Sequence, residues 1–299
     1  MKRAFCSLLL LTAPLVALSA ENLPSKPFAQ MVYLPDSGEW VITPWYQYTE
    51  FQKIWRGSHK ERITVGDDHG FDQNNGMFLF EYGFKDVWAA DLLLGFTDLA
   101  TRSYTPDGQV QKTSGLMDVT FGLRWQVLNE TNCSSPFAPT LTLRAGGIVS
   151  GTYDDDFPFA PGNGSLGIEP SILLAKSFGW PGFGTYGSLG YRRMRSGGKD
   201  QVFGTVGFSQ RYKGFAFNAG VRYQQNTSGD DIEGPSNTLV YSVNIKEVNE
   251  MAEVGVGYTD KGGRHYQFYL DKNFDGRNTG DKYVYGIYVS FPFGGKKGG

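Results

Sequence analysis

The sequence predicts an all-β fold: a transmembrane, antiparallel, up-and-down β-barrel of about 12 strands, with 14 as the alternative. Apolar and polar residues alternate with a period of two over many segments of about ten residues, long enough for a tilted strand to cross a bilayer. The 299 residues include 40 glycines and 15% aromatic residues, which suits strands better than helices. Short turns and long polar loops also alternate along the chain, as in outer-membrane barrels.

The N-terminus has the features of a secretory signal peptide. Lys2 and Arg3 precede an apolar run over residues 8–18, and Ser19 and Ala20 supply small residues at the cleavage point. A membrane anchor is the alternative, but this run is too short to span a bilayer comfortably. We therefore expect four parts: a signal peptide over 1–20, a periplasmic lead-in over 21–37, a β-barrel over 38–293 and a C-terminal tail over 294–299.

The strands follow from the alternation, which is clearest between residues 116 and 127. Phe121, Leu123 and Trp125 share one face, while Gly122 and Arg124 lie on the other. Comparable segments are expected at 39–52, 75–84, 87–104, 115–128, 137–153, 162–178, 183–195, 201–213, 215–226, 238–247, 251–260, 264–274 and 283–293.

The strand count must be corrected, because these 13 segments make an odd number and bacterial single-chain barrels are even. The doubtful segment is 238–247, which we expect to be an external excursion, leaving 12 strands. Pairing of residues 28–34 would instead give 14.

The apolar faces allow two architectures. In a soluble secreted sandwich they would form the core, whereas in a membrane barrel they would contact lipid. Segment length, a glycine-rich polar face and aromatic residues near strand ends favour the barrel. The aromatic residues assigned to interfacial girdles include Trp40, Trp45, Trp88, Trp125 and Trp180.

The connections predict an orientation. Lys85-Asp86 and Lys213-Gly214 are expected to form two-residue turns. Longer polar stretches lie at 53–75, 105–115, 154–163 and 225–237. If the short turns face the periplasm, the long loops face the cell exterior.

Charged residues on the polar faces are the candidate functional residues. An arginine or lysine facing lipid near mid-membrane costs about 2–4 kcal/mol, so these residues should point inward. They could form a constriction that orients a solute, or salt bridges that brace the walls; the constriction predicts higher conductance for Arg124→Ala and Arg144→Ala. Near-equal numbers of acids and bases argue against strong ion selectivity. The expected lumen-lining residues are Glu81, Asp91, Asp118, Arg124, Arg144, Glu169, Arg192, Arg211, Arg222, Glu253 and Asp271.

Four short pieces of the chain carry a family resemblance: residues 35–40 (PDSGEW), 46–49 (YQYT), 80–86 (FEYGFKD) and 275–280 (DGRNTG). Together they resemble the outer-membrane transporters assigned to the meta pathway of phenol degradation, a family loosely related to long-chain fatty-acid channels. The layout is similar over most of residues 35–293. The resemblance implies uptake of small apolar or aromatic compounds.

The last strand resembles the assembly signal of outer-membrane barrels. Gly286 and Val289 precede a final aromatic residue, Phe291 or Phe293. Pro292 interrupts the pattern, and the chain continues after the aromatic residue. The resemblance implies recognition by the barrel-assembly machinery.

Catalysis and cofactors find little support in the sequence. His59 and His69 lie in a long loop, and His265 has no serine at a matching offset, so we expect no enzyme, catalytic residue or cofactor. Residues 271–276 match the first half of a calcium loop, but Lys282 stands where the loop needs glutamate, so no metal site is assigned, although calcium at external loops stays an open alternative. A net charge of −2 argues against nucleic acid.

These observations predict a protein of the Gram-negative outer membrane that contacts lipid. We expect a porin-like channel for passive passage of small, apolar or aromatic molecules. The alternative is a non-conducting structural or surface-binding protein whose loops carry the function.

Overall fold

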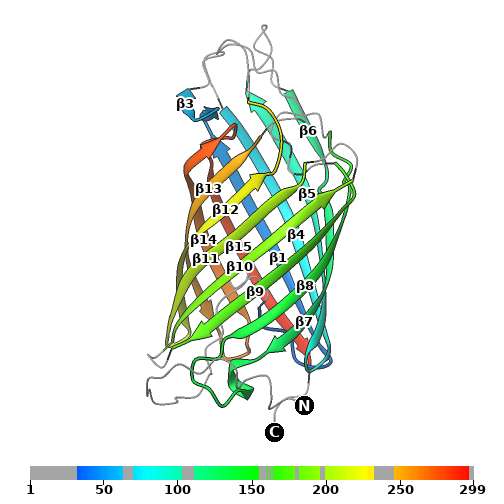
Figure 1. Ribbon diagram of the computed structural model, residues 1–299, viewed down its shortest axis with the longest axis vertical. Helices are drawn as coiled ribbons and strands as arrows, with labels where there is room; N and C mark the ends of the chain where they lie inside the picture. The colour runs from blue at the N-terminus through cyan, green and yellow to red at the C-terminus, as the bar shows by residue number, and fades with distance from the viewer. Residues whose placement is uncertain are drawn as a thin grey trace.

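The computed structural model describes residues 32–62, 70–102, 111–154, 160, 162, 164–178, 182–195, 199–231 and 246–295 (Figure 1). The strands are β1 Glu39–Phe51, β2 Lys53–Arg56, β3 His59–Arg62, β4 Gly70–Lys85, β5 Trp88–Arg102, β6 Gln111–Leu116, β7 Val119–Leu128, β8 Thr140–Val149, β9 Gly167–Ser177, β10 Phe183–Met194, β11 Gln201–Tyr212, β12 Phe215–Asn226, β13 Val248–Thr259, β14 His265–Arg277 and β15 Tyr283–Gly294. A short 3-10 helix covers Glu130–Asn132. Within these residues, no helix is long and apolar enough to cross a membrane.

The sheet closes into a barrel because β1 pairs with β15 on one side and with β4 on the other. All neighbours are antiparallel, and β6 and β7 occupy successive parts of one strand beside β5, which makes 12 strands. The predicted count is therefore confirmed. Most of the doubtful segment, residues 238–245, lies outside the described residues, and β13 begins at Val248 rather than at residue 251.

The segment that showed the clearest alternation is interrupted. Met117 and Asp118 separate β6 from β7, so the prediction of one unbroken strand over 115–128 is wrong. The carboxylate of Asp118 accepts hydrogen bonds from the amide of Gly151 at 3.0 Å and from Tyr153 Oη at 2.9 Å. The amide of Met117 still donates to the carbonyl of Gly95 on β5 at 2.9 Å, so at this point backbone pairing is combined with side-chain bonds to the segment after β8.

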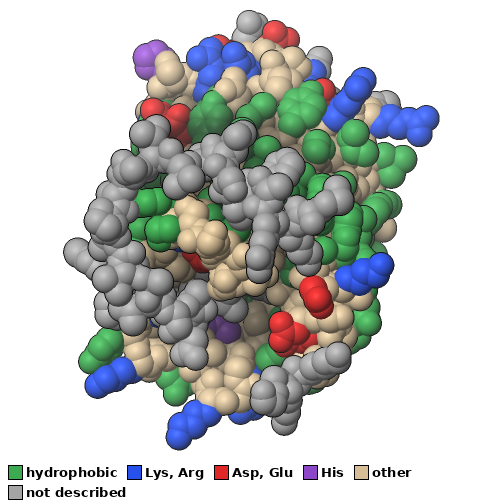
Figure 2. Space-filling view, turned by 60° about the horizontal axis from the view of Figure 1, so that its bottom comes forward, with side chains coloured by type: hydrophobic (Ala, Val, Ile, Leu, Met, Phe, Trp, Pro, Cys, Tyr) green, Lys and Arg blue, Asp and Glu red, His purple; other side chains and the backbone are tan. Residues whose placement is uncertain are grey.

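The apolar faces point outward over the barrel wall. On β7, Phe121 and Trp125 are 48% and 42% exposed, whereas Arg124 between them is fully buried. Phe217 on β12 and Ile287 on β15 are likewise exposed. In Figure 2, hydrophobic side chains cover the visible side wall, while the hollow at the near end shows mainly polar groups and backbone. This is the opposite of a soluble sandwich, whose apolar side chains would be inside.

The two ends of the barrel differ as expected, with three corrections. The turn predicted at Lys85-Asp86 lies one residue later, at residues 86–87, because β4 continues through Lys85 and pairs it with Trp88. Lys213 and Gly214 form the predicted two-residue turn, with φ of 49° and 87°, the left-handed values that a type I′ hairpin requires. At the same end, however, residues 129–139 make a long connection between β7 and β8. At the other end, β2 and β3 form a hairpin within the segment expected to be a loop, and β4 already begins at Gly70.

The β2–β3 hairpin is held by contacts distant in sequence, which is why its short, polar strands escaped prediction. The amide of Trp55 donates to the carbonyl of Thr279 at 2.7 Å, and the amide of Gly57 donates to Oδ1 of Asn278 at 2.8 Å. Ile54 is 2% exposed beneath the hairpin. These contacts fix the hairpin against the end of β14.

Candidate functional site

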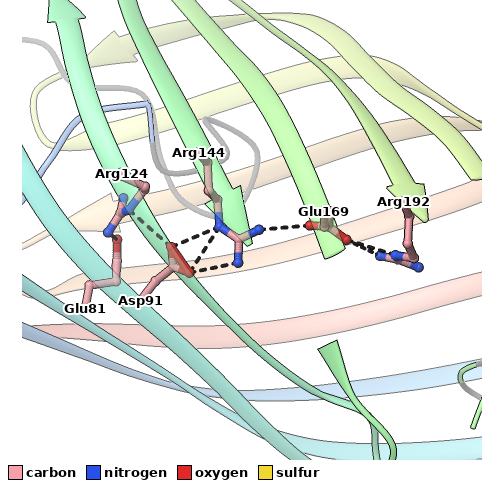
Figure 3. A network of polar contacts seen from close by, with 6 residues as sticks. All are labelled: Glu81, Asp91, Arg124, Arg144, Glu169 and Arg192. Carbon is pink, nitrogen blue, oxygen red and sulfur yellow. Dashed lines mark hydrogen bonds and ion pairs between the residues drawn. The ribbon is translucent and has the colours of Figure 1, made fainter. Parts of the chain in front are cut away.

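One wall of the barrel carries a chain of alternating acids and arginines on its inner face (Figure 3). Nη2 of Arg124 lies 2.8 Å from Oε1 of Glu81, and Nε of Arg124 lies 3.3 Å from Oδ1 of Asp91. The next guanidinium, that of Arg144, donates to both oxygens of Asp91 at 3.0 and 2.9 Å. Asp91 therefore joins two arginines, the bidentate arrangement with Arg144 being among the stronger ion-pair geometries.

The chain continues through Glu169 to β10. Nη1 of Arg144 donates to Oε1 of Glu169 at 2.9 Å, and Arg192 donates to Oε2 from Nε at 2.9 Å and from Nη2 at 2.6 Å. Exposure rises along the chain, because Arg124 is fully buried whereas the Arg192 side chain is 27% exposed. One end of the network is thus shielded from solvent, and the other is partly exposed inside the barrel.

Two glycines make room for the central arginine. A Cβ atom at Gly122 would lie 2.6 Å from Nε of Arg144, and one at Gly146 would lie 2.4 Å from its Nη1. Any larger residue at either position would displace the guanidinium. The glycine-rich polar face thus lets Arg144 lie flat against the wall.

The register places like charges directly opposite each other on neighbouring strands, and their side chains pair with opposite charges from other strands. Glu81 is directly opposite Asp91, and Arg124 is directly opposite Arg144. Such pairs are destabilising in isolation, but here each acid contacts an arginine from another strand. With three acids and three arginines, the network is formally neutral.

A second group of charged residues lies on β12, β13 and β14. Nη2 of Arg222 lies 2.5 Å from Oε1 of Glu253, and its Nη1 lies 3.7 Å from Oδ2 of Asp271. Both carboxylates are 1% exposed, whereas the Arg222 side chain is 40% exposed. This group holds two acids and one arginine, so it carries one excess negative charge.

The two other predicted residues lie apart from both groups. Asp118 occupies the interruption between β6 and β7 and is partly buried. Arg211, near the end of β11, is partly buried and has the phenols of Tyr33 and Tyr288 as electrostatic neighbours.

Inward-facing aromatic residues form a group that the sequence interpretation missed. Trp45 donates from Nε1 to Oη of Tyr269 at 2.7 Å, and Tyr269 donates to Oε1 of Gln47 at 3.1 Å. The rings of Trp45 and Tyr288 lie 6.4 Å apart, edge to face. Assigning Trp45 to a lipid-interface girdle was therefore wrong. Its period-two spacing from the polar residues Thr43, Gln47 and Thr49 was the available signal.

Part of the expected lead-in also lies inside the barrel. Val32 is completely buried, and its carbonyl accepts hydrogen bonds from Oγ1 of Thr142 at 2.5 Å and from Nε2 of Gln126 at 3.4 Å. Tyr33 donates to Oε1 of Glu130 at 3.0 Å. The signal peptide predicted over residues 1–20 lies outside the described residues.

The histidines and the predicted calcium-loop residues were the remaining candidates for chemistry, and those that the structure describes belong to strands or hydrogen-bond to neighbouring side chains. His265 lies within hydrogen-bond distance of Thr259 Oγ1 at 2.9 Å and Gln267 Oε1 at 3.2 Å, while His69 lies outside the described residues. Residues 271–276 belong to β14, so they form a strand rather than a calcium loop. In the part of the chain that the structure describes, no three His, Cys, Asp or Glu side chains come together as metal ligands.

The barrel has the fold of a solved outer-membrane channel. The COG4313 outer membrane channel from Pseudomonas putida F1 aligns with a TM-score of 0.68 at 13% identity, over 91% of this chain and 100% of that chain. The translocator domain of autotransporter NalP from Neisseria meningitidis aligns at 0.48 and 11% identity, over 90% and 93% of the two chains. The P. putida toluene transporter TodX aligns at 0.44 and 10%, over 90% and 93%. No protein-family model and no curated protein matches the sequence.

Proposed function

We propose that this protein is an outer-membrane channel through which small molecules pass passively and without catalysis, apolar or aromatic compounds being the leading class. The observation that carries the proposal is a closed barrel with an apolar outer surface and a charged inner one. Such a surface is stable in lipid, and closure leaves no backbone group unpaired at a sheet edge. The fold shared with a solved outer-membrane channel supports the location.

Aromatic side chains support the proposed solute class. Trp45, Tyr269 and Tyr288 face inward beside polar partners. Trp45 is the partly exposed member of this group and offers a ring on which an aromatic solute can stack, while Tyr269 and Tyr288, which are 2% and 1% exposed, pack beside it. The resemblance to transporters of the meta pathway of phenol degradation points to the same compounds.

A non-conducting role is the second candidate, and one observation favours it. Val32, Leu173, Tyr186 and Tyr288 pack together inside the barrel, and all four are nearly inaccessible to solvent. Side chains packed in this way narrow any passage. Such a protein would act through its loops or as a structural component.

Reconstitution separates the two functions. A channel should make liposomes swell in aromatic solutes and give single-channel steps in planar bilayers; a structural barrel should do neither. Within the channel reading, Arg192→Ala should raise conductance because this side chain is 27% exposed. Arg124 has no exposed surface, so we do not expect it to contact a solute directly. This revises the expectation for Arg124 that rested on strand faces alone.

We also propose the export route and the division of the chain predicted from the sequence, with cleavage after residue 20 and assembly through the last strand. Pairing of β15 with both β14 and β1 supports the assembly role, because this strand closes the barrel. Mass spectrometry of the mature protein tests the cleavage point. Loss of outer-membrane insertion in Phe291→Ala, but not in Phe274→Ala, tests the role of the last strand.

A further inference from the structure

One row of inward-facing residues crosses five adjacent strands and begins on β10, the strand on which the neutral network ends. In register it comprises Tyr186, Gly207, Gly220, Glu253 and Asp271, from β10 to β14. Glu253 and Asp271 are therefore direct cross-strand neighbours. Two ionised carboxylates so placed repel each other unless positive charge lies between them.

Arg222 supplies only part of that positive charge. The electrostatic neighbours of Asp271 are Arg222 and Glu253, so the described residues give this group one cation for two acids. Oε2 of Glu253 and both oxygens of Asp271 are buried and have no hydrogen-bond donor among the described residues. Arg222 is thus shared between two carboxylates that keep oxygens without a hydrogen-bond donor, and burying an incompletely compensated charge is unfavourable.

A buried tyrosine is aimed at the same place. The side chain of Tyr186 lies along the wall over two glycines, because a Cβ at Gly207 would be 2.5 Å from its Oη and one at Gly220 would be 3.1 Å away. Gly220 is the cross-strand neighbour of Glu253, so the hydroxyl points toward the acid pair. Tyr186 is 3% exposed, and its electrostatic neighbours are Glu253, Asp271, Arg222 and the side-chain amide of Asn218.

We propose that Glu253, Asp271 and Tyr186 form a binding site for one monovalent cation, an alkali metal ion or a small ammonium group. A single positive charge would neutralise the group, and the carboxylate oxygens that lack a donor would ligate the cation together with the neighbouring phenol oxygen of Tyr186. A divalent cation fits less well, because calcium takes six to eight oxygen ligands and Arg222 already lies against both carboxylates. This site goes beyond the proposed channel function and does not depend on conduction.

The test measures the thermal unfolding midpoint of the full protein in detergent at pH 8. Circular dichroism monitors the unfolding. Potassium replaces N-methylglucamine, a bulky organic cation, at constant chloride. We expect the midpoint to rise with potassium and saturate, by about 2–4 °C at roughly five times the dissociation constant. Methylammonium giving the same rise assigns the site to any small single charge; a rise with potassium alone assigns it to an alkali ion.

Matched variants locate the effect. Asp271→Asn and Glu253→Gln each remove one charge with little change of shape and should abolish the potassium-dependent rise. Glu169→Gln removes one carboxylate from the neutral network and should keep the rise. The proposal is overturned if the parent protein melts identically in the two salts, or if Glu169→Gln loses the rise as completely as Asp271→Asn. The first outcome needs no variant, so a variant that fails to fold does not decide the matter.

Discussion

Replacing Arg124 with methionine should destabilise the barrel strongly. Arg124 and Glu81 are completely buried, and the arginine contacts Glu81 at 2.8 Å and Asp91 at 3.3 Å. Methionine keeps most of the side-chain volume, so the change removes charge rather than packing. Removing one partner of a buried ion pair costs about 3–5 kcal/mol. The equilibrium constant for unfolding should therefore increase by at least about 100-fold, since each 1.4 kcal/mol is a factor of ten.

The second change in the same pair shows whether charge is the cause. In Arg124→Met, Glu81 loses its arginine, whereas Asp91 keeps its contact with Arg144 at 2.9 Å. Adding Glu81→Gln removes the uncompensated charge and should recover about half of the lost free energy or more. Arg192→Met is the control, because its side chain is 27% exposed and Glu169 retains Arg144, so the loss should stay below about 1 kcal/mol.

Urea unfolding in lipid vesicles, monitored by tryptophan fluorescence, gives the free energy of unfolding. It is measured for the parent protein, Arg124→Met, the double variant with Glu81→Gln, and Arg192→Met. The reasoning fails if Arg124→Met is within about 1 kcal/mol of the parent, or if adding Glu81→Gln makes it no more stable.

Two further predictions concern other parts of the barrel. Gly286→Ala would place a Cβ 2.0 Å from the ring of Tyr269 and should cost roughly 1–3 kcal/mol in urea unfolding. Gly76→Ala, where no atom lies within 4 Å, is the control; equal losses would contradict the steric argument. In the exposed loop after β12, a hydrogen bond from Arg277 lowers the pKa of Asp231. Because the folded-state pKa is depressed, this contact stabilises the loop above the ordinary aspartate pKa of about 4 and is lost as the pH falls below it. The protection factors of amides 227–231, corrected for the intrinsic pH dependence of exchange, should fall there, and Asp231→Asn should remove that fall.

The strands could be predicted from the sequence wherever one face meets lipid along its whole length. The prediction for 215–226 matches β12 at both ends, because Phe215 and Phe217 alternate with Ala216 and Asn218 without interruption. The turn at Lys213-Gly214 could likewise be predicted, because it depends only on residues next to each other in the sequence. The hairpin of β2 and β3 was not, since its position depends on Asn278 and Thr279, more than 200 residues away.

The charged groups show a different limit of prediction from the sequence. Alternation places a residue on the inner face, but not beside a particular residue of the next strand. Arg144 joins Asp91 to Glu169 only because the register sets Gly122 and Gly146 beside its guanidinium. Sequence spacing within one strand carries no information about that register. Pairing and the neutral or acidic balance of each group therefore emerged only from the structure.

The ion-pair chain also bears on how the barrel deforms. It crosses the interfaces from β4 to β10, so sliding one of these strands past its neighbour must pull charged partners apart. Around β1 and β15, the described side-chain contacts are hydrogen bonds rather than ion pairs, such as those of Thr43 with Ser290, Trp45 with Tyr269 and Tyr285 with Glu50. The barrel cross-section should consequently fluctuate unevenly. The strands from β4 to β10 should resist deformation more than the strands around β1 and β15. Shape fluctuations in the bilayer would then follow one preferred direction.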